Sequence, residues 1–382
     1  MDSNDIIREI KVEKADKVIL NKEDVLKWLN SLKINKASGP DKIAGRVLKS
    51  CKHELVDVIF KLFNMSIDSH TVPLLWKTSN IIPIPKNKSV KEMNDLRPIS
   101  LTSILMKGLE KLVKNIVYEQ VKDQLDCHQF AYLSGRGVDD AQITLLHYLQ
   151  SHLDKPGTYA RVLFVDFSSA FNTIQPHLLI KTLVNLNVNN NVILWIYSYL
   201  VDRKQCVQFK DEVSDYVVTN TGSPQGGVLS PFLFTLYTNK CHSTSQNVKI
   251  VKYADDTACA GLIKDSEFTY RSEVDAFVSW CKSNFLQINI KKTEEMIIDF
   301  KTKKSNINPL VINNEPIKIV SKYKYLGTTI DDKLKFECNV DMIYSKANKR
   351  LYFLRSLYKI NIDKIILKLF YQSIVQSVIT FV

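Results

Sequence analysis

The chain has 382 residues, and at about 150 residues per domain this length allows two or three lobes. Hydrophobic residues make up 45% and charged residues 24%, an ordinary globular composition that excludes a disordered or fibrous chain. Lys and Arg outnumber Asp and Glu by 52 to 40, and the resulting charge of +12 favours a polyanionic partner, nucleic acid first and an anionic membrane second.

Targeting and cysteine signals are weak. No stretch reaches the roughly 18 uninterrupted apolar residues of a membrane-spanning helix, and the start, MDSNDIIREIK, lacks the basic and apolar parts of a secretory signal. The seven cysteines are odd in number and form no C-x-x-C pair, so they indicate neither a disulfide framework nor a zinc site. We therefore expect an intracellular protein, nuclear or cytoplasmic, in a reducing compartment.

The N-terminal third predicts helices and one strand. Residues 22–35 have helical apolar spacing, and the Gly-Pro of KASGPDKI (36–43) ends that helix. Residues 54–68 and 100–126 also read as amphipathic helices. Between them, SNIIPIPKNKSV (79–90) predicts a strand running into a basic loop, and its prolines favour an edge strand.

The rest of the chain alternates strands and helices. The continuous apolar run RVLFVDF (161–167) ends in a carboxylate and is typical of a buried strand. KIVKY and TACAGL predict two short strands separated by Ala-Asp-Asp. The other expected elements are a helix at 190–201, a hairpin of 204–209 with 215–220, helical spacing after Gly222, a helix at 267–286, strands to about 330, and a basic helical segment from 341 onward.

Carboxylates at strand ends carry the chemistry. Asp166 ends an apolar strand, where a carboxylate is costly unless a cation or donors meet it. Asp255 and Asp256 lie in the turn between the two short strands. If these segments are neighbours in one sheet, the carboxylates converge, and divalent cations such as Mg²⁺ would offset their repulsion. Two such ions promote in-line phosphoryl displacement, so the pattern favours a nucleotidyl transferase or a nuclease.

Several motifs stand in the order of the reverse transcriptase motifs: FVDFSSAF (164–171), GSPQGGVLSP (222–231), YADD (253–256), the stretch from Trp280 to Lys292-Thr293, and YKYLG (323–327). Upstream, KASGPDKI, WKTSNIIPIPK, NDLRPISLTS (94–103) and HQFAYLSGRGVDDA (128–141) resemble the finger region of LINE-type (non-LTR) retrotransposon reverse transcriptases of the jockey-like kind. The resemblance covers about residues 25–382, and the order and spacing of the motifs together make it strong.

The resemblance implies roles for single positions. Asp166 and Asp255 are similar to the paired catalytic metal ligands, with Asp256 as a supporting carboxylate, and the cofactors would be two Mg²⁺ ions with Mn²⁺ as a substitute. Lys292 stands where the family has a lysine near the leaving pyrophosphate, and the neighbouring Lys291 competes for that role.

The resemblance also implies a nucleotide site and a nucleic-acid surface. An aromatic at Phe171 would exclude a ribose 2′-hydroxyl, and Lys86 and Arg97 would hold the incoming triphosphate. The implied nucleotide-binding set is Lys86, Arg97, Phe167, Phe171, Gln225 and Tyr253. In the basic run 346–359, the residues expected to bind nucleic acid are Lys346, Lys349 and Arg350.

The implied fold is an α+β right-hand polymerase with helical fingers, an antiparallel palm sheet and a partial helical thumb. We expect an N-terminal finger extension over 1–66, fingers and palm over 67–330, and the start of a truncated thumb over 331–382. The implied function is RNA-directed DNA polymerase activity that copies an RNA template from a primer 3′-hydroxyl by two-metal phosphoryl transfer. The partners would be template RNA, a DNA primer or target and deoxynucleoside triphosphates, without a membrane.

Some features depart from the family pattern. Asn172 stands where many relatives have Asp, no endonuclease domain precedes residue 1, and the chain stops in the apolar SVITFV. We therefore expect an element-derived fragment with an intact catalytic core. Two alternatives stay open: an RNA-templated RNA polymerase, against which the bulky Phe171 argues, and a non-catalytic RNA-binding remnant, against which the complete set of three aspartates argues.

Overall fold

A computed structural model describes residues 7, 10, 17–86, 89–302 and 307–380. The chain divides into two compact units, each built from separate stretches of sequence. Unit 1 comprises Met1–Ser134, Phe167–Cys241 and Ser279–Gln287, and unit 2 comprises Gly135–Asp166, His242–Val278 and Ile288–Val382. The mixture of helices and sheets agrees with the expected α+β class.

Unit 1 is rich in helices. Its elements are α2 (Lys22–Ser31), α3 (Gly45–Ser50), α4 (Lys52–Asp68), α5 (Leu74–Lys77), β1 (Ser79–Pro85), η2 (Met93–Asp95), β2 (Leu96–Leu101), α6 (Ile104–Val121), η3 (Lys122–Gln124), η4 (Ala170–Asn172), α8 (Pro176–Asn185), α9 (Asn190–Leu200), β4 (Arg203–Phe209), β5 (Glu212–Val213), β6 (Val217–Thr219) and α10 (Ser230–Tyr237). Aromatic packing joins its first helices, because the Phe63 ring centroid lies 5.8 Å from those of both Trp28 and Trp76. The indole of Trp28 also lies directly against Gly108 of α6, where a Cβ would meet the ring at 2.4 Å.

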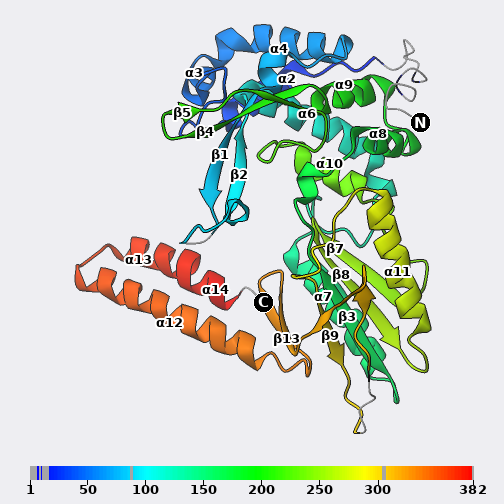
Figure 1. Ribbon diagram of the computed structural model, residues 1–382. Helices are drawn as coiled ribbons and strands as arrows, with labels where there is room; N and C mark the ends of the chain where they lie inside the picture. The colour runs from blue at the N-terminus through cyan, green and yellow to red at the C-terminus, as the bar shows by residue number, and fades with distance from the viewer. Residues whose placement is uncertain (1–6, 8–9, 11–16, 87–88, 303–306, 381–382) are drawn as a thin grey trace. The chain divides into compact units, whose positions relative to one another are not determined.

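The sheet of unit 1 corrects two expectations. Its path is β2-β1-β4-β5, with β6 also paired to β4, and Figure 1 shows β1 and β2 running side by side. The edge-strand prediction for β1 is wrong over residues 79–81, because this half pairs with β2 and, in parallel, with β4. Pro83 and Pro85 lie in the half that pairs with β2 alone, where a missing N–H costs no ladder hydrogen bond.

The helix expected from residue 100 is wrong at its start. Residues 100 and 101 belong to β2, and α6 begins at Ile104 after Ser103, whose hydroxyl accepts a hydrogen bond from the Met106 N–H. Residues 100 and 101 pair with β1, and Ser103 is a favourable N-cap residue, so the helix begins after it. The helix expected over 22–35 likewise ends at Ser31, since Leu32 is extended.

Unit 2 is organised around a second sheet. Its elements are α7 (Val138–Leu153), β3 (Tyr159–Val165), β7 (Val248–Tyr253), β8 (Asp256–Ile263), most of α11 (Phe268–Ser283), β9 (Glu294–Ile298), β10 (Val311–Ile312), β11 (Glu315–Pro316), β12 (Lys318–Ile319), β13 (Lys322–Tyr325), β14 (Thr328–Asp331), α12 (Glu337–Lys359), α13 (Lys364–Phe370), the π-helical turn η5 (Tyr371–Gln376) and α14 (Ser377–Ile379). The strand order is β12-β9-β3-β8-β7, so β3 lies in the centre, as Figure 1 shows. The expected antiparallel sheet is right for four strands and wrong for β12, which runs parallel to β9 after the long connection that parallel pairing needs.

A charged network is buried against one face of β3. The Arg161 guanidinium is completely buried and donates to both Glu295 oxygens at 2.8 and 2.7 Å and to Glu267 at 2.7 Å. Tyr270 of α11 donates to Glu295 at 2.9 Å, and Tyr159 donates to Glu267 at 2.7 Å. Every charge in this network therefore has a partner, which is the condition for burying one.

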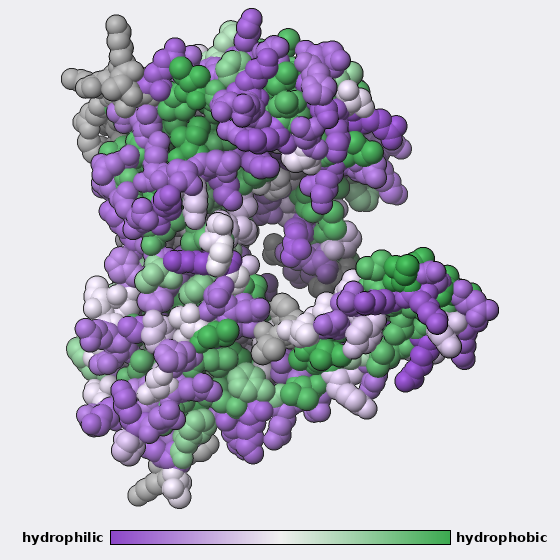
Figure 2. All heavy atoms as spheres, turned by 180° about the vertical axis from the view of Figure 1, so that it is seen from behind, coloured by the Kyte–Doolittle hydropathy of each residue, from purple (hydrophilic) through white to green (hydrophobic). Residues whose placement is uncertain are grey.

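The C-terminal helices expose much apolar surface. Ile365 and Leu369 of α13 are 71% and 58% exposed, and Figure 2 shows green side chains gathered on the helical segment that α12 and α13 form. Across the residues that the structure describes, no helix combines the length and apolar character needed to cross a bilayer.

Candidate active site

The pairing of β3 with β8 brings the aspartates of two motifs together. The strands are antiparallel with Val165 opposite Thr257, so one step further Asp166 stands opposite Asp256. The β7–β8 hairpin closes with Tyr253 opposite Asp256, and Asp255 lies in its turn. The prediction that these segments are sheet neighbours is therefore confirmed.

The electrostatics of this strand end reflect crowded negative charge. The pKa of Asp256 is raised to about 6, first because protein surrounds it and removes hydration, although part of its surface reaches solvent, and then because Asp255 and Asp166 lie near. Burial and the charges of Asp256, Asp166 and Glu294 raise the pKa of Tyr323 to about 12. A cation at this end would relieve the repulsion.

A turn beside Asp166 carries the predicted lysine. The Asn289 N–H donates to the Asp166 carbonyl at 2.8 Å, and the Asp166 N–H donates to the hydroxyl of Thr293, which is buried, at 3.4 Å. Lys292 lies in this turn and is exposed, as is Lys291. The turn is thus fixed to the strand that ends in Asp166.

Two tyrosines near the carboxylates were not among the predicted site residues. Tyr323 stacks on Phe164 of β3 with ring centroids 4.0 Å apart and planes at 7°. Tyr325 is 2% exposed, its hydroxyl makes no hydrogen bond within the described residues, and burial followed by the charge of Asp256 raises its pKa. The YKYLG motif (323–327) was part of the resemblance to reverse transcriptases, but the sequence indicated no role for the ring of Tyr323 or Tyr325.

The donor set at the strand end suits a hard divalent cation. Carboxylate oxygens are the ligands Mg²⁺ prefers. The pKa of Asp256 is raised first by burial and then by the charges of Asp255 and Asp166, and a cation would offset those two charges. In the part of the chain described, the single group of three ligating residues with ligand atoms within 4.8 Å of one another is Asp126, Cys127 and His128, not the three aspartates.

Phe167, Phe171 and Gln225 belong to unit 1, where the GSPQGG loop is firmly held. Phe167 is half-buried, and so is Phe171, whose ring centroid lies 5.2 Å from that of Phe234 and whose carbonyl accepts the Ser223 N–H at 2.9 Å. The Gln225 carbonyl accepts the Ser100 N–H of β2 at 2.7 Å.

Gly222 is required in the same loop. Its φ is +70°, and a Cβ there would lie 2.7 Å from the Cα of Asn172. The loop therefore packs tightly on η4, which also fixes the backbone around Phe171.

The predicted finger cations share one end of the β1–β2 pair. Lys86 directly follows β1, is exposed, and its N–H donates to the Asp95 carbonyl at 2.8 Å. Arg97 is an exposed residue of β2 opposite Ile84.

The remaining predicted residues belong to unit 2. Tyr253 is the half-buried last residue of β7. Lys346 and Lys349 are exposed on α12, whereas the Arg350 guanidinium donates to the Ile374 carbonyl at 2.5 Å and is partly engaged in packing η5.

Two family profiles match different parts of the chain. The profile of the family described as reverse transcriptase (RNA-dependent DNA polymerase) matches residues 84–330, more than half of the chain. A second profile, that of the N-terminal part of alkylated DNA repair protein alkB homolog 8, matches residues 336–377.

Curated relatives come from mobile elements. The chain is 27% identical over 349 residues to the probable RNA-directed DNA polymerase from transposon BS of Drosophila melanogaster, covering 88% of this chain and 38% of that protein. It is 26% identical over 335 residues to the RNA-directed DNA polymerase from mobile element jockey of the same species, covering 84% and 36%. The jockey protein of Drosophila funebris is 27% identical over 353 residues, covering 88% and 38%. The chain thus spans less than two fifths of the length of these relatives.

Proposed function

The chain belongs to the reverse transcriptase family, among the jockey-like enzymes of LINE-type retrotransposons, and we propose on that premise that it copies RNA into DNA from a primer 3′-hydroxyl. The observation that carries this proposal is the convergence of Asp166 with Asp255 and Asp256 at one end of the central strands. In the same proposal, the β3-centred sheet is the palm, the β1–β2 strands and their helices belong to the fingers, and α12 to α14 begin the thumb.

The three aspartates would hold the divalent ions. When bound, two Mg²⁺ ions would activate the primer hydroxyl and stabilise the leaving oxygen of the triphosphate. Asp166 is held in place for this role through both its backbone N–H and its carbonyl, so its position is set by the sheet and the adjoining turn. Most catalysis of phosphoryl transfer is positioning and charge stabilisation, which such rigid strand ends provide.

Other residues would recognise the nucleotide. Lys86 and Arg97 would neutralise the triphosphate, and Lys292 would assist the leaving pyrophosphate. The Phe171 carbonyl accepts the Ser223 N–H, which holds the backbone of this residue in place. The Phe171 ring would occupy the space of a ribose 2′-hydroxyl. Phe167, Gln225 and Tyr253 would line the same nucleotide.

Primer extension on poly(rA)/oligo(dT) with dTTP and Mg²⁺ tests the function. The wild-type chain should extend the primer, and Asp255→Asn should abolish extension while RNA binding stays nearly unchanged, because affinity rests on Lys and Arg contacts to phosphate. Extension with UTP in preference to dTTP would indicate an RNA polymerase. RNA binding without any extension would indicate a binding remnant, and wild-type extension by Asp255→Asn would remove Asp255 from the mechanism.

A further inference from the structure

A tight turn in unit 1 carries three side chains of the kinds that bind transition metals. Among the residues that the structure describes, Asp126, Cys127 and His128 form the one group of His, Cys, Asp and Glu side chains whose ligand atoms all lie within 4.8 Å of one another. The spacing of the cysteines did not indicate this group, because its members are consecutive in the chain and converge only through the shape of the turn.

Backbone hydrogen bonds hold this turn. The Gln129 N–H donates to the Asp126 carbonyl at 3.1 Å, so Cys127 and His128 are its two central residues. Oδ1 of Asp126 accepts the His128 N–H at 2.9 Å, a local bond that favours aspartate in turns. The side-chain oxygen of Asn239, two residues after α10, accepts the Asp126 N–H at 2.8 Å. The backbone that carries the three ligands is therefore ordered before an ion binds, which lowers the entropic cost of binding.

The distances between the ligand atoms suit a tetrahedral ion. Sγ of Cys127 lies 3.7 Å from Nδ1 of His128, and that nitrogen lies 4.0 Å from Oδ1 of Asp126. Tetrahedral zinc, with Zn–S of about 2.3 Å and bonds to nitrogen and oxygen of about 2.0–2.1 Å, needs separations of about 3.5 Å and about 3.4 Å. The sulfur and the nitrogen stand close to the first value, and the carboxylate has to approach by about 0.6 Å.

Burial of the three groups favours a bound cation. The Asp126 side chain is only 6% exposed and that of His128 is 22% exposed, whereas Cys127 lies at the surface. A carboxylate with so little access to water favours a positive charge beside it. Three protein ligands leave the fourth tetrahedral position to water, as in open zinc sites, and the exposed thiol marks the side from which the ion enters.

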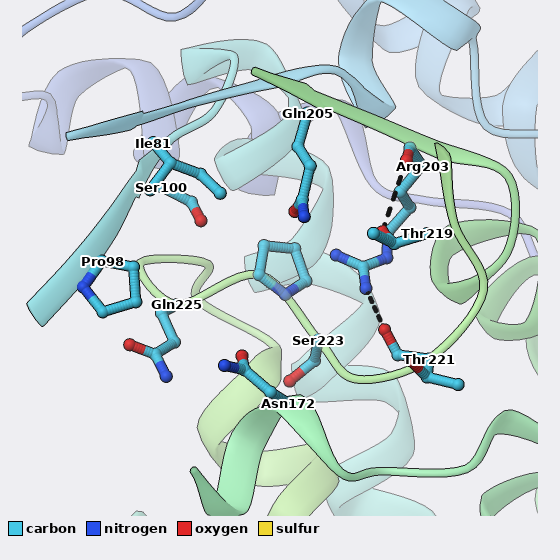
Figure 3. A pocket seen from close by; sticks show the side chains of 11 residues that line it. Ile81, Pro98, Ser100, Asn172, Arg203, Gln205, Thr219, Thr221, Ser223 and Gln225 are labelled. Atoms are coloured by element: carbon cyan, nitrogen blue, oxygen red, sulfur yellow. Dashed lines mark hydrogen bonds between the residues drawn. The ribbon is translucent and has the colours of Figure 1, made fainter. Parts of the chain in front are cut away.

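The polar pocket beside the GSPQGG loop offers no comparable set of ligands. Its lining contains no Asp, Glu, His or Cys, and its one charged residue is Arg203. Arg203 is 6% exposed and donates to the Thr221 carbonyl, as Figure 3 shows. A positive charge repels a metal ion, so within the described part of unit 1 the turn, and not this pocket, is the candidate metal site.

We propose that Asp126, Cys127 and His128 bind one transition-metal ion of the Zn²⁺ class, with Cys127 as the thiolate. Binding releases the thiol proton to solvent. Thiolate and imidazole select Zn²⁺ over Mg²⁺, which takes oxygen ligands, so this site differs in chemistry from the three aspartates of the sheet. The inference does not rest on polymerase activity.

Titration of the full, reduced chain with Co²⁺ in excess Mg²⁺ tests the site, because a cobalt–thiolate bond absorbs in the near ultraviolet and Mg²⁺ does not. Wild type should show this charge-transfer band at one Co²⁺ per chain, and Zn²⁺ should remove it. Cys127→Ser should abolish the band. His128→Asn and Asp126→Asn should each weaken Co²⁺ binding by about tenfold or more, since a direct ligand contributes no less than a residue that supports one. Asp126→Asn keeps an oxygen for the His128 N–H, so the turn itself is retained.

Cys51→Ser is the matched control. Cys51 is also an exposed thiol of unit 1 with a histidine and an acid close in sequence, His53 and Glu54, but in the structure these three side chains do not form such a group. The Cys51→Ser variant should keep the charge-transfer band and the wild-type affinity for Co²⁺.

Several results would overturn the proposal. These are absence of the charge-transfer band in wild type, its loss in Cys51→Ser, or its persistence in Cys127→Ser. Displacement of Co²⁺ by Mg²⁺ alone would assign the ion to carboxylates instead, and unchanged affinity in Asp126→Asn would refute the three-ligand site. Because the titration contains no primer or nucleotide, failure of primer extension alone would refute the proposed function and leave this site standing.

Discussion

Glu110 of α6 offers the sharpest test of how the GSPQGG loop is held. The residue is completely buried, and its Oε2 accepts the N–H groups of Val228 and Leu229 at 2.6 and 2.9 Å, while its Oε1 has no hydrogen-bond partner among the described residues. Burial outweighs these hydrogen bonds and raises the pKa of the carboxyl to about 7. The folded chain therefore favours the protonated acid.

The raised pKa of Glu110 sets the size of the expected change in the free energy of unfolding. A carboxyl with a pKa near 4.5 when unfolded and about 7 when folded makes the folded state bind the proton more tightly. The free energy of unfolding then falls as pH rises from 4.5 to 7, by roughly 3 kcal/mol in all. Glu110→Gln removes the ionisation and keeps an oxygen for both N–H groups, so this pH-dependent loss should disappear. At pH 8 the variant should be the more stable protein.

Tryptophan fluorescence during urea unfolding suits this measurement, because all four tryptophans, at positions 28, 76, 195 and 280, belong to unit 1, as Glu110 does. Wild type and Glu110→Gln should unfold at similar urea concentrations at pH 5 and diverge at pH 8. Glu119→Gln is the control on the same helix, because Glu119 is exposed and bonded only to Lys122. If Glu110→Gln were the less stable protein at pH 8, the loop N–H groups would hold a charged carboxylate and the reasoning would be wrong.

Two further predictions concern substrate and nucleic acid. Phe171→Ala should raise ribonucleotide incorporation by about 10² and lower deoxynucleotide incorporation modestly, measured as the ratio of kcat/KM for dTTP and UTP. A fixed ratio with both rates lowered would mean that Phe171, which packs on Phe234, is only a core residue. Replacing Lys346 and Lys349 with Gln should lower the salt slope of primer–template binding by about 0.7–0.9 for each lost contact, and an unchanged slope would identify them as solvated surface residues.

Local sequence patterns were sufficient for the central strands. The apolar run before Asp166 and the turn at Asp255 predicted the strands β3, β7 and β8. A short uninterrupted apolar segment that ends in a charged residue is typical of a buried strand. The pairing of β3 with β8 was then the simplest way to bring the carboxylates together, and the register confirms it.

Features that depend on distant partners were not visible in the sequence. The parallel pairing of β1 with β4 places Ser79 opposite Gln205, far along the chain, so the prolines alone suggested an edge strand. Glu110 reads as a solvent-facing acid of an amphipathic helix, since periodicity does not show that a loop far along the chain covers it. Arg203 lies just before the hairpin expected at 204–209 and was not singled out, because its burial depends on three-dimensional surroundings.

The buried Arg161 network has a consequence for the opposite end of its strand. Arg161 stands five residues before Asp166, about 16 Å away along an extended strand. A slip of β3 by one residue would turn the guanidinium toward the face where Phe164 stacks on Tyr323 and leave Glu295 buried without its partner, at a cost of roughly 3–5 kcal/mol. The buried ion pair of Arg161 with Glu295 thus favours one register of β3. Because the strand is continuous, the same register also sets the position of Asp166 relative to Asp256 at its other end.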